Sequence, residues 1–403
     1  MACAEFLQPF GPEFFIEGEV PGNPGLSFYN SQVKPIHETQ IMLTKIAQIA
    51  RATRAPVFFI STILFLLSIA QPLAAQDKPA KLFTSDDTMN LTLTASWRTI
   101  ERDKKNQEPY PATLKYTDEL GKTHTLEMTV ERRGITRQKV CDFPPIKLRF
   151  KKETVKGTTF RGQKSLKMVT HCEKSSRFEQ YYLLEMLSYK MYNLINDYSF
   201  RVRPLNVTYI DPDSNKTYSD RFAFLIEDDS DVAKRNDLKK LKIPKIRVSQ
   251  LEPGITSEFS LFQYMIGNVD WAALSGPDPT ECCHNVKLIG PEPFGAKDIA
   301  YPVPYDFDSS GLVDAHYAAP PNGLPIRRVT QRLFRGYCID NSTLEDARKK
   351  ILSHEAAFYS LIRDEDRLSS GSQNKSTRFL DKFFKIIKDP KDFDRLVTSK
   401  CRK

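Results

Sequence analysis

The sequence contains no internal repeat, no long run of basic residues and no nucleic-acid-binding motif. Its formal net charge of +9 comes from dispersed groups such as Lys239-Lys240, Arg327-Arg328 and Lys349-Lys350. A protein that binds a polyanion usually concentrates its positive charge on one face or element. Nucleic acid is therefore not expected as a partner, and a basic surface beside a small anionic substrate explains the charge equally well.

No apolar run is long enough to span a bilayer comfortably. The longest, Val57 to Ala70, follows Arg51 and Arg54 and precedes the small residues of Gln71 to Ala75. This order is typical of a secretory signal. We expect residues 1–41 to be an upstream extension without a structural role, residues 42–75 to be the signal peptide, and the mature chain to be secreted or periplasmic. The alternative is that this segment is retained as an N-terminal anchor, which would be the protein's one contact with a membrane.

The sequence also lacks a Cys-x-x-Cys pair, which argues against a structural zinc site. Beyond Cys3, the cysteines are Cys141, Cys172, Cys282, Cys283, Cys338 and Cys401. An even number of cysteines in an exported chain indicates disulfides. We expect Cys141 to pair with Cys172, and one of Cys282 or Cys283 to pair with Cys338. A metal or redox cluster of Cys282, Cys283 and His284 is the competing interpretation.

Strands precede helices along the chain. Apolar residues alternate with period two at Leu91–Ala95 and Leu126–Val130, and Leu205–Ile210 with Phe222–Ile226 forms a predicted hairpin. Residues 76–230 are accordingly expected to form a β-rich lobe.

The second half is predicted to be helical. Apolar spacing indicates helices at Phe178–Ile195 and Ser257–Ile266, and Ser342 with Glu345 has the spacing of a capping box. The charged residues 230–254 are expected to form an exposed loop. Residues 231–403 would then be a helical lobe, so that the fold class is α+β with two lobes rather than alternating βαβ units.

The segment from Pro302 to Gly311 carries the clearest chemical signal. An apolar run ends on Asp306 and Asp308, which a strand would direct to one face. Two carboxylates beside apolar residues are costly without a cation, and oxygen ligands suit Mg²⁺ or Mn²⁺. An Asp turn at a strand end is the alternative interpretation.

Three further residues complete the parts that phosphoryl transfer needs. Asp270 could accept the proton of the attacking hydroxyl, Asn285 could bind the metal, and Lys147 could bind the nucleotide phosphates. Taken alone, Asp270 and Asn285 also fit turn residues, and Lys147 fits a solvated strand face. Upstream, Arg133, Gly134 and Thr136 follow a strand as a basic glycine turn that could hold phosphate, although an ordinary charged hairpin has the same residues.

The order of these motifs resembles the CotH (spore coat protein H) family of atypical, secreted protein kinases. The resemblance covers roughly Met128 to Gly311: Arg-Gly-x-Thr, a Lys-Leu-x-Phe strand, a Ser-x-x-x-Glu helix, a hairpin ending in Leu-x-Glu, Gly-Asn-x-Asp, Asn-x-x-Leu and Pro-Tyr-Asp-Phe-Asp. It implies a two-lobed, kinase-like fold that uses ATP with Mg²⁺ or Mn²⁺ to phosphorylate exported proteins on Ser or Thr.

By position, the resemblance implies roles for individual residues. The glycine turn would be Arg133 to Thr136, the phosphate-binding lysine Lys147, the glutamate that orients it Glu179 or Glu185, and the hinge residue Glu227. Asp270 would be the catalytic aspartate, Asn285 the metal-side asparagine and Asp306 the metal aspartate, with Asp308 beside it.

The sequence departs from the family at two places. Trp271 stands where the family has a basic residue, and residues 272–284 lengthen the gap between Asp270 and Asn285. The expected function is a secreted kinase acting on an exported protein or a small hydroxyl-bearing acceptor. The alternatives are a non-catalytic pseudokinase that binds an anionic ligand in a basic cleft, and a metal-dependent phosphoesterase built on Asp306 and Asp308.

Overall fold

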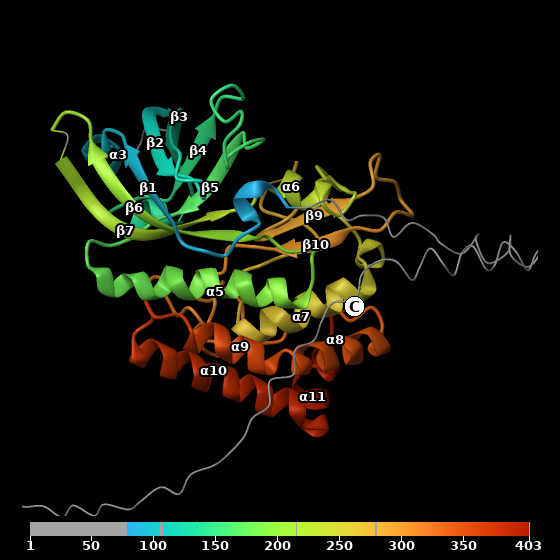
Figure 1. Ribbon diagram of the computed structural model, residues 1–403. Helices are drawn as coiled ribbons and strands as arrows, with labels where there is room; N and C mark the ends of the chain where they lie inside the picture. The colour runs from blue at the N-terminus through green and yellow to red at the C-terminus, as the bar shows by residue number, and fades with distance from the viewer. Residues whose placement is uncertain (1–78, 105–107, 135, 215, 279, 403) are drawn as a thin grey trace, which may run out of the picture. The chain divides into compact units, whose positions relative to one another are not determined.

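The computed structural model describes residues 79–402 except 105–107, 135, 215 and 279 (Figure 1). The expected upstream extension (1–41) and signal peptide (42–75) lie outside these residues. The described residues all belong to one compact unit that spans Ala74–Lys403. Within them, the helices are all too short or too polar to cross a membrane.

A closed β-barrel occupies the first half of the described chain (Figure 1). Its strands, in the order in which they pair, are β1 (Met89–Thr94), β2 (Tyr110–Thr117), β3 (Thr123–Arg132), β4 (Ile146–Phe150), β5 (Ser165–Val169), β7 (Lys216–Ile226) and β6 (Val202–Asp211). Neighbouring strands are antiparallel except β1 and β6, which close the barrel in parallel. Alternation places Leu93, Leu114 and Leu148 inside, fully buried.

A short helix, α3 (Trp97–Arg102), covers one end of the barrel. Its Trp97 is fully buried and meets the ring of Tyr209 edge-on at 5.0 Å. The indole N–H donates a hydrogen bond to the carbonyl of Leu93 at 3.1 Å. The barrel interior is thus sealed by an aromatic side chain whose single polar atom is paired.

Helix α5 (Glu179–Ile195) lies between the barrel and the C-terminal helices (Figure 1). It matches the predicted helix, but a 3₁₀ turn at Ser176–Phe178 precedes it and no serine side chain caps it. Leu183 and Met191 are fully buried in a core shared with both neighbours. The wide apolar stripe in the sequence therefore reflects a helix that is covered on two sides.

The remaining helices stack below α5 (Figure 1). They are α7 (Pro253–Ile266), α8 (Asn341–Ser353), α9 (Glu355–Arg363), α10 (Ser370–Lys388) and α11 (Pro390–Leu396), with shorter α4 (Thr136–Val140) and α6 (Asp229–Lys234) beside the barrel, and 3₁₀ turns η2 (Lys81–Phe83), η4 (Val248–Gln250) and η5 (Thr398–Lys400). The mixed α+β class is confirmed.

Two predicted helix starts were wrong. Helix α7 begins at Pro253 rather than Ser257, because the Glu252 carboxylate accepts a hydrogen bond from the Ile255 N–H and caps the first turn. Helix α8 is capped by Asp340, which accepts from the Ser342 N–H at 2.9 Å, so Ser342 lies inside the helix.

The prediction of a loop at 230–254 was also wrong. This stretch contains most of α6 and the strand β8 (Lys239–Lys240), which pairs with β9 (Val286–Gly290). Strand β9 pairs in turn with β10 (Tyr301–Pro304) to complete a small antiparallel sheet. Two lysines form a strand here because their pairing partner lies far along the chain, which local composition does not reveal.

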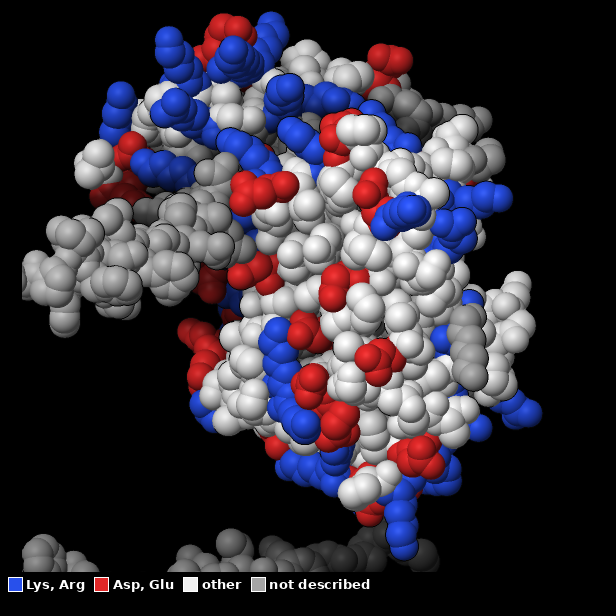
Figure 2. Space-filling model, turned by 90° about the vertical axis from the view of Figure 1, so that its right-hand side faces the viewer, with Lys and Arg blue, Asp and Glu red and all other residues white. Residues whose placement is uncertain are grey.

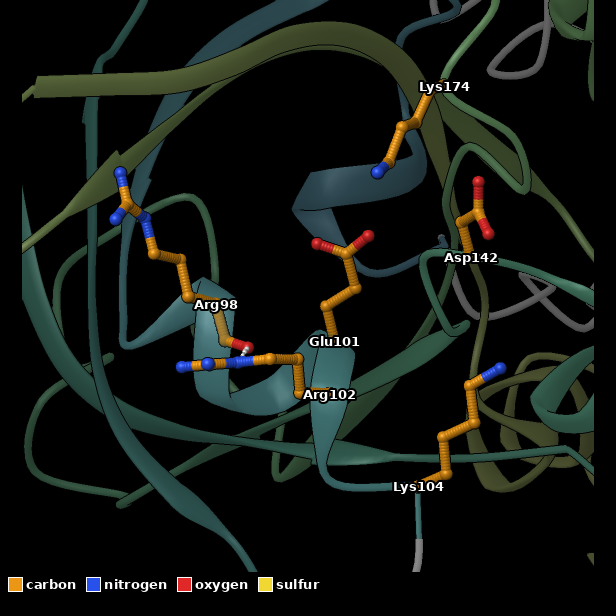
Figure 3. A pocket seen from close by; sticks show the side chains of 6 residues that line it. All are labelled: Arg98, Glu101, Arg102, Lys104, Asp142 and Lys174. Atoms are coloured by element: carbon orange, nitrogen blue, oxygen red, sulfur yellow. Dashed lines mark hydrogen bonds between the residues drawn. The ribbon is translucent and has the colours of Figure 1, made fainter.

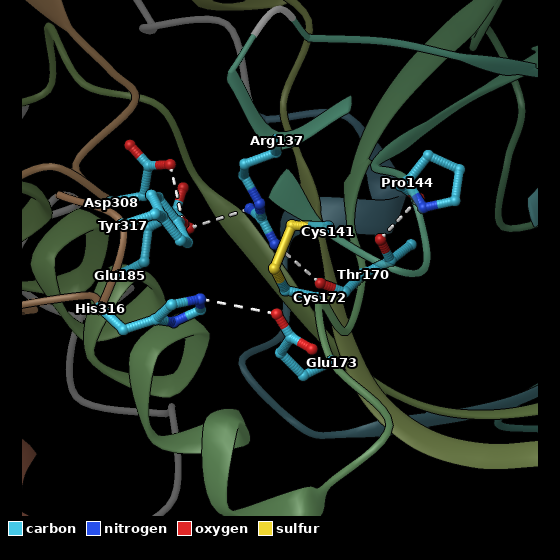
Figure 4. Close-up of a disulfide and its surroundings, with 10 residues drawn as sticks. All are labelled: Arg137, Cys141, Pro144, Thr170, Cys172, Glu173, Glu185, Asp308, His316 and Tyr317. Carbon is cyan, nitrogen blue, oxygen red and sulfur yellow. Dashed lines mark hydrogen bonds and ion pairs between the residues drawn. A yellow bond between two sulfur atoms is a disulfide. The ribbon is translucent and has the colours of Figure 1, made fainter. Parts of the chain in front are cut away.

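The six cysteines of the described chain form three disulfides. Cys141 pairs with Cys172 as predicted (Figure 4). The expected bond from Cys282 or Cys283 to Cys338 was wrong, because Cys282 and Cys283 pair with each other and Cys338 pairs with Cys401. The C-terminal segment explains the last pair: Arg402 donates its N–H to the carbonyl of Gly336 at 2.9 Å and so brings Cys401 beside Cys338.

Candidate functional site

A cavity of about 560 Å³ lies between the turn that follows β3, strand β5 and the small sheet of β9 and β10. Seven of the residues selected from the sequence line it: Arg133, Gly134, Thr136, Asp270, Asn285, Asp306 and Asp308. They come from the turn after β3 and from three places between Asp270 and Asp308, which are more than 130 residues further along the chain. The fold therefore gathers the glycine turn, the three aspartate candidates and Asn285 around one space.

The glycine turn enters the cavity from the end of β3. Gly134 has φ = +85°, a conformation that residues with a side chain rarely adopt. Arg133 donates from Nε to the carbonyl of Ile146 at 3.3 Å, and its N–H donates to the carbonyl of Pro145 at 3.0 Å. The turn is thus held against the start of β4 with its basic side chain at the cavity wall.

Asp306 follows the last residues of β10 and is held by its neighbours. Its backbone N–H donates to the hydroxyl of Tyr189 at 2.9 Å, and its φ is +63°, which Asp tolerates better than most residues. The next residue, Phe307, is fully buried and lies 4.6 Å from the ring of Tyr189. The aromatic anchor and the backbone turn together direct Asp306 to the cavity.

Asp308 is more enclosed than Asp306. Its Oδ2 accepts a hydrogen bond from the Tyr317 hydroxyl at 2.9 Å, and Ser309 Oγ lies 3.3 Å from Oδ1. Burial and the neighbouring carboxylate of Asp306 raise the pKa of Asp308 to about 6, against the opposing effect of Arg137. The buried Asp308 carboxylate is therefore costly to ionise beside Asp306, a situation that a bound cation relieves.

Asp270 and Asn285 are in direct contact. The Asn285 amide nitrogen donates to the carbonyl of Asp270 at 2.7 Å and to its Oδ2 at 3.2 Å. The amide oxygen of Asn285 is left as the atom with which this residue could bind a metal. His284 Nε2 lies 2.8 Å from Asp270 Oδ1, and this hydrogen bond raises the pKa of His284.

The segment between Asp270 and Asn285 forms a closed loop. Ala272 and His284 exchange two backbone hydrogen bonds of 3.0 Å, so the chain returns to its starting point. The Cys282–Cys283 disulfide lies within this loop, and Cys283 lines the cavity. The insertion noted in the sequence therefore does not separate Asp270 from Asn285; it forms part of the cavity rim instead.

A buried ion pair supports the inner wall. Arg137 Nη1 lies 3.5 Å from Glu185 Oε2 on α5, and Arg137 Nη2 donates to the carbonyl of Thr170 at 2.9 Å (Figure 4). Burial raises the pKa of Glu185 to about 8, although Arg137 opposes the shift. Of the two glutamates considered for this helix, Glu185 thus faces the site through Arg137, whereas Glu179 lies half-buried near Arg221.

Lys147 does not line the cavity. Its Nζ lies 3.5 Å from Glu131 Oε1 on the neighbouring strand. The residue directly opposite it on the other neighbour is Lys167, and this lysine does line the cavity. Burial, followed by the charges of Arg133 and Lys287, lowers the pKa of Lys167 to about 8. Its Nζ lies 4.6 Å from the centre of the Tyr305 ring.

Glu227 also lies apart from the cavity. It is 1% exposed, and its carboxylate accepts a hydrogen bond from Arg235 Nε at 3.1 Å and another from the N–H of Arg201 at 3.0 Å. These contacts use both carboxylate oxygens to join the end of β7 to Arg235, after α6, and to Arg201, before β6. The contacts of Glu227, which the resemblance placed at the hinge, thus indicate a structural role.

Sequence reasoning gave no role to several charged residues that line the cavity, among them Arg137, Lys167 and Lys287. Lys167 in Ser-Leu-Lys-Met-Val and Lys147 in Ile-Lys-Leu-Arg-Phe both stand between apolar residues in a strand. The local pattern of the two lysines is therefore the same, and only strand order distinguishes them. His284, directly before Asn285, was considered only as part of a metal or redox cluster with Cys282 and Cys283.

Charge is unevenly distributed around this region. In Figure 2, Lys and Arg side chains gather over the upper part of the face, whereas acidic and basic side chains are mixed over the lower part. At the cavity itself, the barrel side contributes the cations Arg133, Arg137 and Lys167, and the opposite side contributes the carboxylates together with Lys287 on β9. This arrangement could bind an anion and a cation next to each other.

Among the described residues, no group of three or more His, Cys, Asp and Glu side chains is arranged to hold a metal ion by itself. Mg²⁺ usually binds through one or two carboxylates plus substrate phosphates and water. The pair Asp306 and Asn285 fits that requirement, with Asp308 behind it. Comparison of the chain with protein-family models and with curated protein sequences finds no match.

Proposed function

We propose that this protein is a secreted, CotH-like kinase that transfers the γ-phosphoryl group of ATP to a hydroxyl acceptor. One observation carries the proposal: seven of the residues chosen for one nucleotide–metal site, from the turn after β3 and from three places between Asp270 and Asp308, line a single cavity. Random surface acids and amides would have no reason to converge in this way. The barrel and the helical layers would be the two lobes of a kinase-like fold, with the cavity between them.

The cations of the barrel side would bind the phosphates. Arg133 and Lys167 line the same cavity as the carboxylates. Lys167 takes the role expected of Lys147, because it is the lysine of this sheet that reaches the cavity. The buried Arg137–Glu185 pair would hold the inner wall in position, in the way that a buried pair fixes geometry.

Asp306 and the amide oxygen of Asn285 would hold Mg²⁺ or Mn²⁺, and the ion would bridge and neutralise phosphate oxygens. Asp308 would act mainly by positioning, since Tyr317 and Ser309 contact its carboxylate. Asp270 would accept the proton of the acceptor hydroxyl. Its side chain is 30% exposed and lines the same cavity, and His284 and Asn285 fix its orientation.

An exported Ser/Thr protein or a small hydroxyl-bearing molecule is the proposed acceptor, and the three disulfides are compatible with the proposed export of the chain. The alternative is a pseudokinase that binds nucleotide or another anion without transfer. Trp271 favours this alternative, because it replaces the basic residue expected after Asp270 and is 2% exposed in the core. Nothing in the described residues favours a phosphoesterase, which needs more ligands around Asp306.

The test is binding followed by transfer. We expect ATP with Mn²⁺ or Mg²⁺ to raise the melting temperature of the purified protein, and Asp306→Asn to remove the metal-dependent part of that rise. Asp314→Asn is the matched control: Asp314 also has a positive φ, of 50°, but its carboxylate pairs with Lys375 at 2.7 Å outside the cavity. A wild-type protein that shows no metal-dependent nucleotide binding would refute the kinase and the nucleotide-binding alternative together.

A further inference from the structure

Apart from the candidate site, two adjoining cavities lie on another side of the barrel, beside α3. The inner cavity has a volume of about 260 Å³ and the outer one about 480 Å³. They share Glu101, Asp142 and Lys174 as lining residues. Figure 3 shows the outer cavity, with Glu101 on α3 and Lys174 directed toward one another across it. The inner volume equals roughly eight or nine water molecules, which is room for a small ligand.

Several buried polar atoms of the inner cavity have no hydrogen-bond partner among the described residues. His171 is 5% exposed and lines the cavity, and its Nδ1 has no hydrogen-bond partner among the described residues. The same holds for the buried Oγ of Ser219 and Nε of Arg221, both on β7. Buried polar atoms are normally paired, so three unpaired ones around one cavity indicate that something else completes them.

The unpaired groups are held in fixed positions. The His171 ring stacks on Phe143 with 4.2 Å between ring centres. Arg221 donates from Nη2 to the carbonyl of Lys174 at 2.7 Å and from Nη1 to the carbonyl of Asp220 at 3.1 Å, which leaves Nε for another partner. The Cys141–Cys172 disulfide joins the two segments that carry Phe143 and His171. The site is therefore rigid before any ligand binds.

The lining alternates between groups that only accept and groups that only donate hydrogen bonds. Glu101, Asp142 and Glu173 accept, while Lys174 and Arg221 donate. Glu101 already accepts a hydrogen bond from the Tyr218 hydroxyl, and Glu173 Oε1 lies 3.5 Å from His316 Nε2. A small anion would meet the three carboxylates, and a small cation would meet the two basic groups. A hydroxyl group both donates and accepts, so a ligand with several hydroxyls can pair with the donor and acceptor atoms that these contacts leave.

We propose that this cavity binds a small polyhydroxylated ligand, either a free monosaccharide or the terminal sugar of a glycan. Ser219, His171 and Arg221 would bind its hydroxyls at the inner end, with Phe143 and Tyr218 as the apolar walls against which a sugar ring packs. The proposal is independent of the kinase site, which shares no lining residue with these cavities.

The experiment titrates the purified protein with a panel of monosaccharides, their methyl glycosides and short oligosaccharides. Saturation-transfer NMR and the melting temperature of the protein measure binding. Inorganic phosphate and L-serine are included as an anion and a zwitterion. We expect at least one sugar to bind saturably and the two non-sugars not to bind. Binding of methyl glycosides and oligosaccharides would identify a glycan terminus, and binding of the free sugar alone would identify a monosaccharide.

Two variants locate the binding. Ser219→Ala should weaken sugar binding about tenfold, the effect of one lost hydrogen bond at a desolvated site. His171→Phe keeps the ring stack, deletes both ring nitrogens and should have a similar effect. Ser399→Ala, which removes an exposed hydroxyl near the C-terminus, should change nothing. The proposal is overturned if no sugar binds, if phosphate or L-serine binds there instead, or if a folded Ser219→Ala protein binds sugar as the wild type does.

Discussion

His284 Nε2 lies 2.8 Å from Asp270 Oδ1, across a loop that the chain closes with two backbone hydrogen bonds between Ala272 and His284. The residues between Asp270 and Asn285, which interrupt the motif in the sequence, therefore hold Asp270 in place through His284. Asp270 and Asn285, separated by residues 271–284, become adjacent, with 2.7 Å between the Asn285 amide nitrogen and the Asp270 carbonyl. The geometry of Asp270 therefore depends on the loop as much as on its own position.

Asp270→Asn is expected to leave nucleotide binding nearly unchanged and to reduce turnover by about 10²–10⁴, because the amide cannot accept the acceptor's proton. Asparagine has the shape of aspartate and can still accept from Asn285, so the cavity should keep its form. Single-turnover phosphoryl transfer and nucleotide titration are the two measurements. Equal transfer by wild type and variant would show that Asp270 is not the base.

Lys167→Met and Lys147→Met form a matched pair of lysines that lie opposite each other on neighbouring strands. Lys167→Met should weaken nucleotide binding by about 10–100-fold, the value of a charge-assisted hydrogen bond to phosphate. Lys147→Met should leave binding intact and lower the free energy of unfolding by no more than about 1 kcal/mol, because only its ion pair with Glu131 is lost. Isothermal titration of both variants with nucleotide measures the two affinities. If Lys147→Met weakens nucleotide binding more than Lys167→Met does, Lys147 is the phosphate ligand.

Replacing both Cys141 and Cys172 by serine should lower the free energy of unfolding by about 3–4 kcal/mol, the chain-entropy value for a sequence separation of 31 residues. Chemical denaturation of the wild type and the double variant measures the difference. Peptide mapping without reduction provides the control, since it should recover one linked peptide pair containing these two cysteines. Free thiols at both positions in the native protein would contradict the bond.

The stability of the barrel should fall in mild acid because of His171. Burial, with the charges of Arg221 and Arg137, lowers the pKa of His171 to about 3. Below an unfolded-state pKa of about 6.5, the unfolded chain binds a proton that the folded chain does not, so the free energy of unfolding decreases as the pH falls from 6.5 toward 3. The contribution lost between pH 7 and pH 4.5 is about 2–3 kcal/mol.

His171→Phe removes this titration and should flatten the dependence of stability on pH relative to the wild type over that interval. Urea denaturation at a series of pH values gives both curves. The difference between the curves cancels the carboxylates, which titrate in both proteins. Parallel curves would mean that His171 is protonated in the folded state.

Local patterns were enough to predict strands and helices with strong periodicity. The predicted hairpin of Leu205–Ile210 with Phe222–Ile226 lies within β6 and β7, and α5 differs from its prediction by one residue at its start. Boundaries failed where a single polar contact decided them, as with Glu252 before α7 and Asp340 before α8. Strand β8 failed because two charged residues adopt an extended conformation only when β9 is present to pair with them.

The candidate site divides in the same way. Asp306, Asp308, Asn285 and Asp270 could be selected from the sequence because each carries an oxygen ligand or base beside an apolar segment. The choice between Lys147 and Lys167 could not be made, since both follow the same alternation. The cysteine pairing was half right, because the partner of Cys338 depends on where the C-terminus returns, beside Gly336.

By itself, the sequence determined the α+β class, the Cys141–Cys172 bond and the residue types that could handle phosphate and a divalent metal, because periodicity and side-chain chemistry are local properties. The tertiary structure alone decided which lysine reaches the cavity, that a closed loop joins Asp270 to Asn285, and that His171, Ser219 and Arg221 surround a second cavity. These depend on strand order and chain return, which bring together residues that are far apart along the chain and that no local pattern relates.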